Sequence, residues 1–197
     1  MKKLLLFGGA FNPPHKGHMK LLEKAIELIE PDLTVIIATS TSPHKQSGDI
    51  SFYHRNRMSQ VFKKLGNVKV SRIENKGRKK RNYTIQSIKW LEKRYKDYEI
   101  YLLIGSDMLI SFTTWSRYRR ILSKATLVVA AREEHEETLK KTVEELEREG
   151  ARIKILLFEP IVISSSEIRN HIHEQKEVGE YLDEEVAEYI EKYGLYR

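Results

Sequence analysis

Short runs of consecutive apolar residues recur along the chain, and longer segments with apolar residues at helical spacing lie between them. The short runs predict β-strands at residues 4–7, 33–39, 68–73, 100–104, 126–131 and 153–158. The longer segments predict helices at residues 19–29, 52–65, 85–95, 110–122 and 138–149. The strands are continuously apolar rather than alternating, which indicates that both faces of their sheet are buried.

This alternation of strand and helix predicts an α/β fold. We expect a doubly wound, Rossmann-like parallel sheet of five to six strands, with helices on both faces and a helical C-terminal portion after Phe158. Residues 1–197 should form a single domain, because no internal repeat or low-complexity linker interrupts them. Ligands of such sheets bind beyond the carboxyl ends of the strands. Several polar or glycine residues follow predicted strands at that edge: Lys45, Gly105, Asp107 and Arg132.

The most informative loop is residues 8–18, Gly-Gly-Ala-Phe-Asn-Pro-Pro-His-Lys-Gly-His, between the first strand and the first helix. A glycine turn that leads into a helix leaves backbone N–H groups unpaired, and the helix dipole favours an anion there. His15 and His18 can each donate a hydrogen bond to a phosphate oxygen. The loop therefore predicts a site for nucleotide phosphates.

Other interpretations of this loop fit less well. The spacing lacks the Gly-x-x-x-x-Gly-Lys-Ser/Thr of a P-loop, and Pro13 and Pro14 stand where a dinucleotide loop would become helix. A zinc site is disfavoured because no glutamate lies between His15 and His18 and the chain has no cysteine. A structural or surface pair of histidines is the plain alternative.

The formal net charge of +7 favours anionic partners without naming one. A basic run at residues 78–81 is followed by Tyr83, which is too little basic and aromatic surface to predict nucleic-acid binding. We interpret this run as solvated surface, with steering of small phosphorylated substrates as the alternative. No apolar stretch nears the roughly 20 residues that a transmembrane helix needs, and the chain has no cysteine. We therefore expect a cytoplasmic protein that binds neither membrane nor nucleic acid.

A second candidate phosphate site lies in residues 163–169, Ile-Ser-Ser-Ser-Glu-Ile-Arg. Ser164 and Glu167 have the spacing of a capping box, which predicts a helix that begins at Ser165. Arg169 then lies on the same helix face as Ser165 and leans toward the helix start, where its guanidinium can help to hold an anion. A plain helix cap with a surface arginine is the alternative for this segment alone.

Together, the loop with His15 and His18 and the segment 163–169 resemble the two motifs of the nucleotidyltransferase superfamily of adenylyl- and cytidylyltransferases. Within it, the chain is similar nearly end to end to the nicotinate-nucleotide adenylyltransferase family. The similarity also covers residues 43–45, 83–84, 104–115, 189–190 and 194–197. The resemblance implies an enzyme of NAD biosynthesis that transfers the adenylyl group of ATP to nicotinate mononucleotide and gives deamido-NAD and pyrophosphate.

The resemblance also implies roles for individual residues. His15, His18 and Arg169 would be catalytic. The residues that would bind ATP are Gly8, Gly9, Ala10, Phe11, His15, His18, Gly105, Asp107, Arg132, Ile163, Ser164, Ser165 and Arg169. Nicotinate mononucleotide would contact Lys45, Tyr83, Thr84 and Trp115, with Trp115 stacked on the pyridine ring. Without the resemblance, Trp115 would be taken as a core aromatic and Asp107 as a helix N-cap.

The chain departs from the family pattern in three loop positions, Ser42, Asn82 and Glu133. The first two leave the expected chemistry intact. Glu133 puts a carboxylate beside Arg132, which makes the role implied for that arginine the least secure.

The expected mechanism is an in-line displacement, with Mg²⁺ as a cofactor that is held by the phosphates of ATP and by water rather than by protein ligands. One alternative is a related adenylyltransferase with nicotinamide mononucleotide or phosphopantetheine as acceptor. Another is a non-catalytic nucleotide- or RNA-binding module. A homo-oligomer is compatible with the sequence, which does not decide the oligomeric state.

Overall fold

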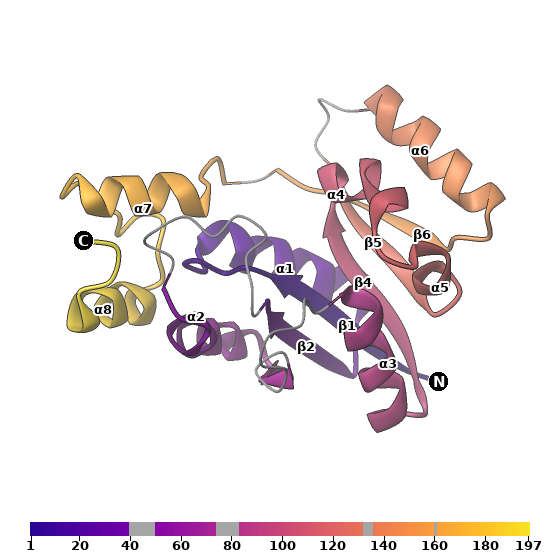
Figure 1. Ribbon diagram of the computed structural model, residues 1–197, viewed down its shortest axis with the longest axis horizontal. Helices are drawn as coiled ribbons and strands as arrows, with labels where there is room; N and C mark the ends of the chain where they lie inside the picture. Colours follow the sequence, from indigo (N-terminus) through magenta and orange to yellow (C-terminus); the bar gives the residue numbers. More distant parts are fainter. Residues whose placement is uncertain (40–49, 74–82, 132–135, 160) are drawn as a thin grey trace.

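The computed structural model describes residues 1–39, 50–73, 83–131, 136–159 and 161–197. At its centre is a six-stranded parallel sheet in the order β3-β2-β1-β4-β5-β6 (Figure 1). The strands are β1 (Lys2–Gly9), β2 (Leu33–Ala38), β3 (Val68–Ser71), β4 (Tyr98–Gly105), β5 (Ala125–Ala131) and β6 (Ile153–Leu157). The doubly wound parallel sheet predicted from the sequence is confirmed, and the winding direction reverses between β1 and β4.

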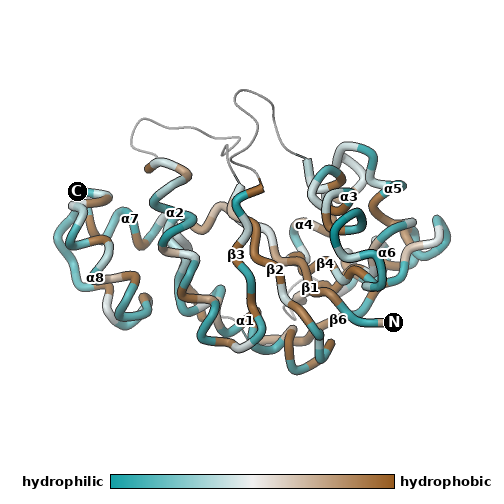
Figure 2. The backbone as a smooth tube through the Cα atoms, turned by 90° about the horizontal axis from the view of Figure 1, so that it is seen from below, coloured by the Kyte–Doolittle hydropathy of each residue, from teal (hydrophilic) through white to brown (hydrophobic). Residues whose placement is uncertain are grey.

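Both faces of this sheet are buried. Every residue of β2 and β5 is buried, because helices on each side cover their consecutive apolar residues. Alternate residues of β1 enter two separate hydrophobic clusters: Leu4 and Leu6 face one, and Leu5 and Phe7 face the other. Figure 2 shows the hydrophobic stretches gathered in the central strands and many hydrophilic stretches on the surrounding helices.

Helices contribute apolar side chains to each cluster. The cluster with Leu4 and Leu6 is covered by α3 (Thr84–Arg94), α4 (Ser106–Ile110), the 3-10 helix η3 (Phe112–Thr114), α5 (Tyr118–Leu122) and α6 (Glu136–Arg148). The cluster with Leu5 and Phe7 is covered by α1 (Lys16–Ile29), α2 (Phe52–Met58), the 3-10 helix η1 (Ser59–Leu65), α7 (Ser165–His173) and α8 (Glu184–Tyr193).

Two segments predicted as single helices are divided in the structure. Residues 52–65 form α2 and then η1, and at the junction Ser59 Oγ donates to the carbonyl of Arg55 at 2.8 Å. A serine that bonds back onto its own helix in this way tends to bend it.

The continuous helix predicted at residues 110–122 is wrong, because this segment forms the end of α4, then η3 and α5. Arg117 has φ 58°, a left-handed conformation that interrupts an α-helix. The apolar spacing is nevertheless satisfied, since Phe112, Ile121 and Leu122 reach the same cluster from separate short elements.

The helical C-terminal portion predicted from the sequence consists of α7 and α8. Figure 1 shows both helices at one end of the molecule, on the side toward which β1 and β2 point. Ile168, Leu182, Val186 and Ile190 anchor this portion to the cluster that contains Leu5 and Phe7. Within the ranges that the structure describes, no helix has the length and apolarity needed to cross a membrane.

Candidate functional site

The predicted site lies where β1 and β4 end. These strands are neighbours in the sheet, with Phe7 paired to Leu103, so Gly9 and Gly105 leave the sheet at the same edge. After β1 the chain continues to β2, which lies on one side of this pair of strands. After β4 it continues to β5, which lies on the other side. Such a switch point is where doubly wound sheets bind their ligands.

The loop after β1 is held in a sharp turn by a buried aromatic ring. A Cβ on Gly9 would lie 2.9 Å from the ring of Phe11, so a larger residue at position 9 would push that ring aside. Phe11 has φ 46°, an unfavourable left-handed conformation for a bulky residue. Its ring is buried and packs edge-on against Phe7 and Phe62. Burial of this ring therefore fixes the course of the loop between Gly9 and the following residues.

His15 and His18 lie together at the start of α1. His15 is the N-cap residue, and the centroid of its ring is 3.8 Å from that of His18. The backbone N–H of His15 donates to Nδ1 of His18 at 3.3 Å. Because Nδ1 accepts this bond, neutral His18 carries its proton on Nε2, and that N–H is its donor toward a ligand.

Gly17 makes this close pairing of the rings possible. A Cβ on Gly17 would lie 2.9 Å from Nδ1 of His15 and 3.0 Å from Cε1 of the same ring. Nδ1 of His15 is itself buried without a hydrogen-bond partner in the described structure. Buried unsatisfied polar atoms are uncommon in folded proteins, and among the described side chains Nδ1 of His171 is the only other one.

Both histidines are uncharged at neutral pH. Burial lowers the pKa of His15 to about 4. Burial, and then the nearby His15, hold the pKa of His18 well below its usual value, and the residue as a whole is partly buried. Each ring is therefore a neutral N–H donor, and an anion placed beside it would raise its pKa.

The second motif begins a helix as predicted. Oγ of Ser164 accepts a hydrogen bond from the N–H of Glu167 at 3.1 Å, and the N–H of Ser164 donates to Oε2 of Glu167 at 2.8 Å. The capping box and the helix start at Ser165 are both confirmed.

This helix start contacts the first motif directly. Oγ of Ser165 donates to the carbonyl of Pro13 at 2.9 Å, across 152 residues of sequence. Nη1 of Arg169 donates to the carbonyl of Asn12 at 2.9 Å, and Nη2 donates to Oγ of Ser166 at 3.1 Å. The segment is therefore more than a helix cap with a surface arginine, because its polar side chains hold the loop that carries the two histidines.

Two further residues, which the sequence did not single out, also hold this loop. Arg55 of α2 is buried, and its Nη1 donates to the carbonyl of Ala10 at 2.7 Å. The hydroxyl of Tyr196 donates to Oδ1 of Asn12 at 2.7 Å. For Arg55 the sequence gives no such signal, because apolar spacing predicts only that its segment is helical. For Tyr196 the one sequence signal was the family similarity of residues 194–197.

Gly105 and Asp107 lie at the start of α4. Gly105 is the N-cap residue and Asp107 lies in the first turn, so the alternative that Asp107 is the N-cap is wrong. Oδ1 of Asp107 would be 2.5 Å from a Cβ on Gly105, which shows that the carboxylate folds back over the end of β4. Glycine at position 105 leaves the room that this carboxylate occupies.

Three of the residues implied for the mononucleotide, Tyr83, Thr84 and Trp115, lie within the described residues, on elements that cover the opposite face of the sheet from α1. Trp115 is partly buried, packs on the cluster that contains Leu4 and Leu6, and has its ring centroid 5.0 Å from that of Phe112. It is thus partly a core aromatic. Tyr83 is exposed and is the N-cap residue of α3, and Thr84 is the first residue of that helix.

Some predicted site residues cannot be placed in this geometry. Lys45 and Arg132 lie outside the described residues, as do Ser42, Asn82, Glu133 and the basic run 78–81. Ile163 is partly buried and packs against the cluster with Leu5 and Phe7. Gly8 has space around it, since a Cβ there would approach the carbonyl of Ile37 no closer than 3.9 Å.

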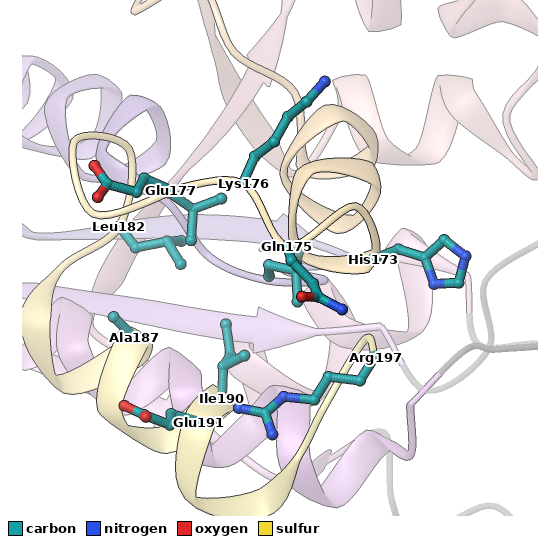
Figure 3. Close-up of a pocket in the computed structure, with 11 residues that line it drawn as sticks. His173, Gln175, Lys176, Glu177, Leu182, Ala187, Ile190, Glu191 and Arg197 are labelled. Atoms are coloured by element: carbon teal, nitrogen blue, oxygen red, sulfur yellow. The ribbon is translucent and has the colours of Figure 1, made fainter.

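A cavity of about 1100 Å³ lies between α7 and α8 (Figure 3). Its lining combines apolar side chains such as Leu182 and Ile190 with charged ones such as Lys176, Glu191 and Arg197. None of the predicted site residues lines it. We therefore do not assign the nucleotide to this cavity.

Protein side chains alone form no metal site in the described part of the chain. Among the residues that the structure describes, no three His, Cys, Asp or Glu side chains are grouped so that they could hold a metal ion.

Comparison with known proteins agrees with this geometry. The profile of the cytidylyltransferase-like family matches residues 6–171. A Clostridium perfringens protein named "probable nicotinate-nucleotide adenylyltransferase" is 32% identical over 203 residues, which span 100% of this chain and 99% of the relative. A protein of the same name from Carboxydothermus hydrogenoformans is 34% identical over 198 residues, which span 99% of this chain and 98% of the relative. The chain therefore belongs to the cytidylyltransferase-like family, and its relatives place it among the nicotinate-nucleotide adenylyltransferases of that family.

The fold agrees with a solved structure as well. Plasmodium falciparum nicotinic acid mononucleotide adenylyltransferase complexed with NaAD matches with a TM-score of 0.80, over 100% of this chain and 98% of that one. The sequence identity is 18%, so this likeness shows the shared fold alone.

Proposed function

We propose that this chain transfers the adenylyl group of ATP to nicotinate mononucleotide, giving deamido-NAD and pyrophosphate. The observation that carries the proposal is the contact between the two phosphate motifs, in which Ser165 and Arg169 hold the loop that leads into His15 and His18. The full-length relatives, which are named for this activity, support the choice of acceptor.

The reaction is a direct displacement. The 5′-phosphate of the mononucleotide attacks the α-phosphorus of ATP, and the bond between that phosphorus and the oxygen of the leaving pyrophosphate breaks. The attacking group is already an anion, so no strong general base is required. The protein aligns the reactants and stabilises the negative charge of the transferring group.

The residues of the first motif act on the transferring phosphate. The neutral Nε2–H of His18 donates to the α-phosphate oxygens, and His15 supports it from the adjacent N-cap position. The loop from Gly8 to Phe11 passes along the nucleotide. The dipole at the start of α1 adds to the positive potential, although the N–H of Lys16 is already bonded to the carbonyl of Tyr181 at 2.8 Å.

The residues of the second motif hold the leaving pyrophosphate. Ser165 lies at the start of α7 beside the loop, and Arg169 reaches the same place. A guanidinium has five N–H donors, so Arg169 can bind a phosphate while it keeps its bond to Asn12. Lys45 and Arg132 are proposed to add positive charge from outside the described residues.

Mg²⁺ is the proposed cofactor, and when bound it neutralises charge on the phosphate oxygens of ATP. The residues present fit an ion that is held mainly by the substrate and water. Asp107, at the end of β4, is a carboxylate at the edge where the phosphates would lie. A cytoplasmic location, the absence of nucleic-acid and membrane partners and a homo-oligomeric state remain predictions.

Substitution of His18 by alanine tests the proposed chemistry. Loss of one donor to the transition state commonly lowers turnover on the order of 100-fold or more. Pyrophosphate release from ATP and nicotinate mononucleotide would measure the rate. His173→Ala serves as a matched control, because His173 is exposed near the far end of α7 and should keep the wild-type rate. Normal turnover by His18→Ala would contradict the mechanism.

The acceptor is tested separately with a panel of phosphorylated compounds. Faster pyrophosphate release with nicotinamide mononucleotide or phosphopantetheine would overturn the acceptor and leave adenylyl transfer intact. RNA binding with steep salt dependence and no pyrophosphate release would instead favour a non-catalytic module.

A further inference from the structure

The chain ends in a tail that turns back toward the phosphate loop. Helix α8 ends at Gly194, which has φ 57° and adopts the left-handed conformation that suits glycine. The N–H of Leu195 donates to the carbonyl of Ile190 at 3.0 Å, a bond typical of this kind of helix end. Leu195 is then buried in the cluster that contains Leu5 and Phe7, and Figure 1 shows the C-terminus beside α7.

Tyr196 follows in an unusual backbone conformation. Its φ is 66°, in the left-handed region that aromatic residues seldom adopt. Such a conformation persists where surrounding contacts hold it, and here the buried Leu195 lies on one side. On the other side, the hydroxyl of Tyr196 donates to Oδ1 of the buried Asn12 at 2.7 Å.

Asn12 is the point where the tail and α7 meet the loop. Its side-chain oxygen accepts from Tyr196, and its backbone carbonyl accepts from Arg169. The next carbonyl, that of Pro13, accepts from Ser165. Three hydrogen bonds from the C-terminal part of the chain thus hold two consecutive loop residues, and His15 follows only two positions later.

We propose that Tyr196 is a positioning residue for adenylyl transfer: it fixes Asn12 and thereby sets the place of His15 and His18. This inference rests on the proposed function and extends the site to the last residues of the chain. Tyr196 acts through Asn12 rather than on the substrate. Its removal should therefore affect the alignment of the transition state more than the binding of ATP.

The test is Tyr196→Phe, which removes only the hydroxyl. Loss of this donor to a buried acceptor should lower kcat about tenfold, with a change of less than about threefold in KM for ATP. Amide hydrogen exchange in residues 10–18 should become about tenfold faster as local opening becomes easier. Tyr101→Phe is the matched control, because its ring lies in the same cluster while its hydroxyl donates to Glu99 at 3.0 Å. The control should keep wild-type kcat and wild-type exchange in the loop.

Each result decides the inference. Wild-type kcat in Tyr196→Phe, or equal losses in Tyr196→Phe and Tyr101→Phe, would overturn it. A raised KM with unchanged kcat would also overturn it, because that pattern indicates loss of ground-state binding alone. If the wild-type protein releases no pyrophosphate, the proposed function fails. The exchange comparison still decides whether Tyr196 holds the loop.

Discussion

His15 combines burial with an unsatisfied ring nitrogen, which an ordinary N-cap residue would not. The residue is 7% exposed, and Nδ1 has no hydrogen-bond partner in the described structure. Burial of an unpaired polar atom is unfavourable for stability. The low pKa of the ring keeps it uncharged at neutral pH, which limits this cost.

This burial predicts that stability depends on pH. The pKa of His15 is about 4 in the folded protein, against an ordinary value of 6.5 when unfolded. The unfolded state therefore binds more protons between these values, and the free energy of unfolding falls as pH is lowered from 6.5 toward 4. For this residue the loss is at most about 3 kcal/mol, and His18 adds to it in the same direction.

Urea unfolding at pH 7.5 and pH 4.5 would measure how much the free energy of unfolding falls. His15→Asn keeps a favourable N-cap residue and removes the titrating ring. It should lose distinctly less stability on acidification than the wild type. An identical pH dependence in the two proteins would show that His15 is not responsible.

At the scale of elements, the start of α1 is arranged differently from the start of α8. Asp183 caps α8, and Glu184 and Glu185 follow in its first turn, so acidic groups already compensate that end of the helix dipole. The first turn of α1 lies wholly within the described residues and contains no acidic residue. No side-chain charge therefore compensates the positive end of this helix, and its first turn carries Gly17 and His18 instead.

Gly17→Ala tests this helix start. Alanine is favoured over glycine in helices by about 1 kcal/mol, so propensity alone would make the variant more stable. The added Cβ would instead meet the ring of His15 at 2.9 Å and displace it. Because misplaced catalytic groups lower rates steeply, turnover should fall by about tenfold or more.

Gly179→Ala is the control for this substitution. A Cβ at Gly179 would meet nothing within 4 Å, so turnover should stay at the wild-type level. Pyrophosphate release measures both variants, and their melting temperatures show whether either has lost stability. Full activity in Gly17→Ala would mean that the position of the His15 ring does not matter.

At the scale of the whole molecule, the site joins segments from both ends of the chain. The loop after β1 is held by Arg55, by Ser165 and Arg169 of α7, and by Tyr196. A ligand that binds across these segments stabilises all of them against unfolding. The six-stranded sheet brings the end of β4 to the same edge, so a ligand bound there also stabilises the loop after β4.

ATP should therefore raise the melting temperature. A ligand at 100 times its Kd stabilises the native state by about 2.7 kcal/mol, which corresponds to roughly 5–10 °C for a chain of this size. Adenosine, which has no phosphates, should give a much smaller shift at the same concentration. Thermal unfolding of the wild type and of Arg169→Ala would test this, with a reduced ATP shift expected in the variant. Equal shifts in melting temperature for ATP and adenosine would show that contacts outside the two phosphate motifs provide the binding energy.

Much of the fold could be predicted because it depends on short-range patterns. The apolar runs located β1 to β6, and the spacing of Ser164 and Glu167 located the start of α7. The division of residues 110–122 was missed because a left-handed residue at Arg117 leaves the apolar spacing unchanged. The roles predicted for Lys45 and Arg132 lie outside the described residues and stay predictions.

The sequence by itself determined most of the strand and helix pattern and the two phosphate motifs, because each depends on residues within a few positions of one another. The alternation of strand and helix then favoured a parallel sheet. Only the tertiary structure decided that α7 and the C-terminal tail hold the loop before His15. It also decided that burial makes both histidines neutral. The physical reason is distance along the chain. The hydrogen bond between Asn12 and Tyr196 spans 184 residues, so no local sequence pattern predicts it.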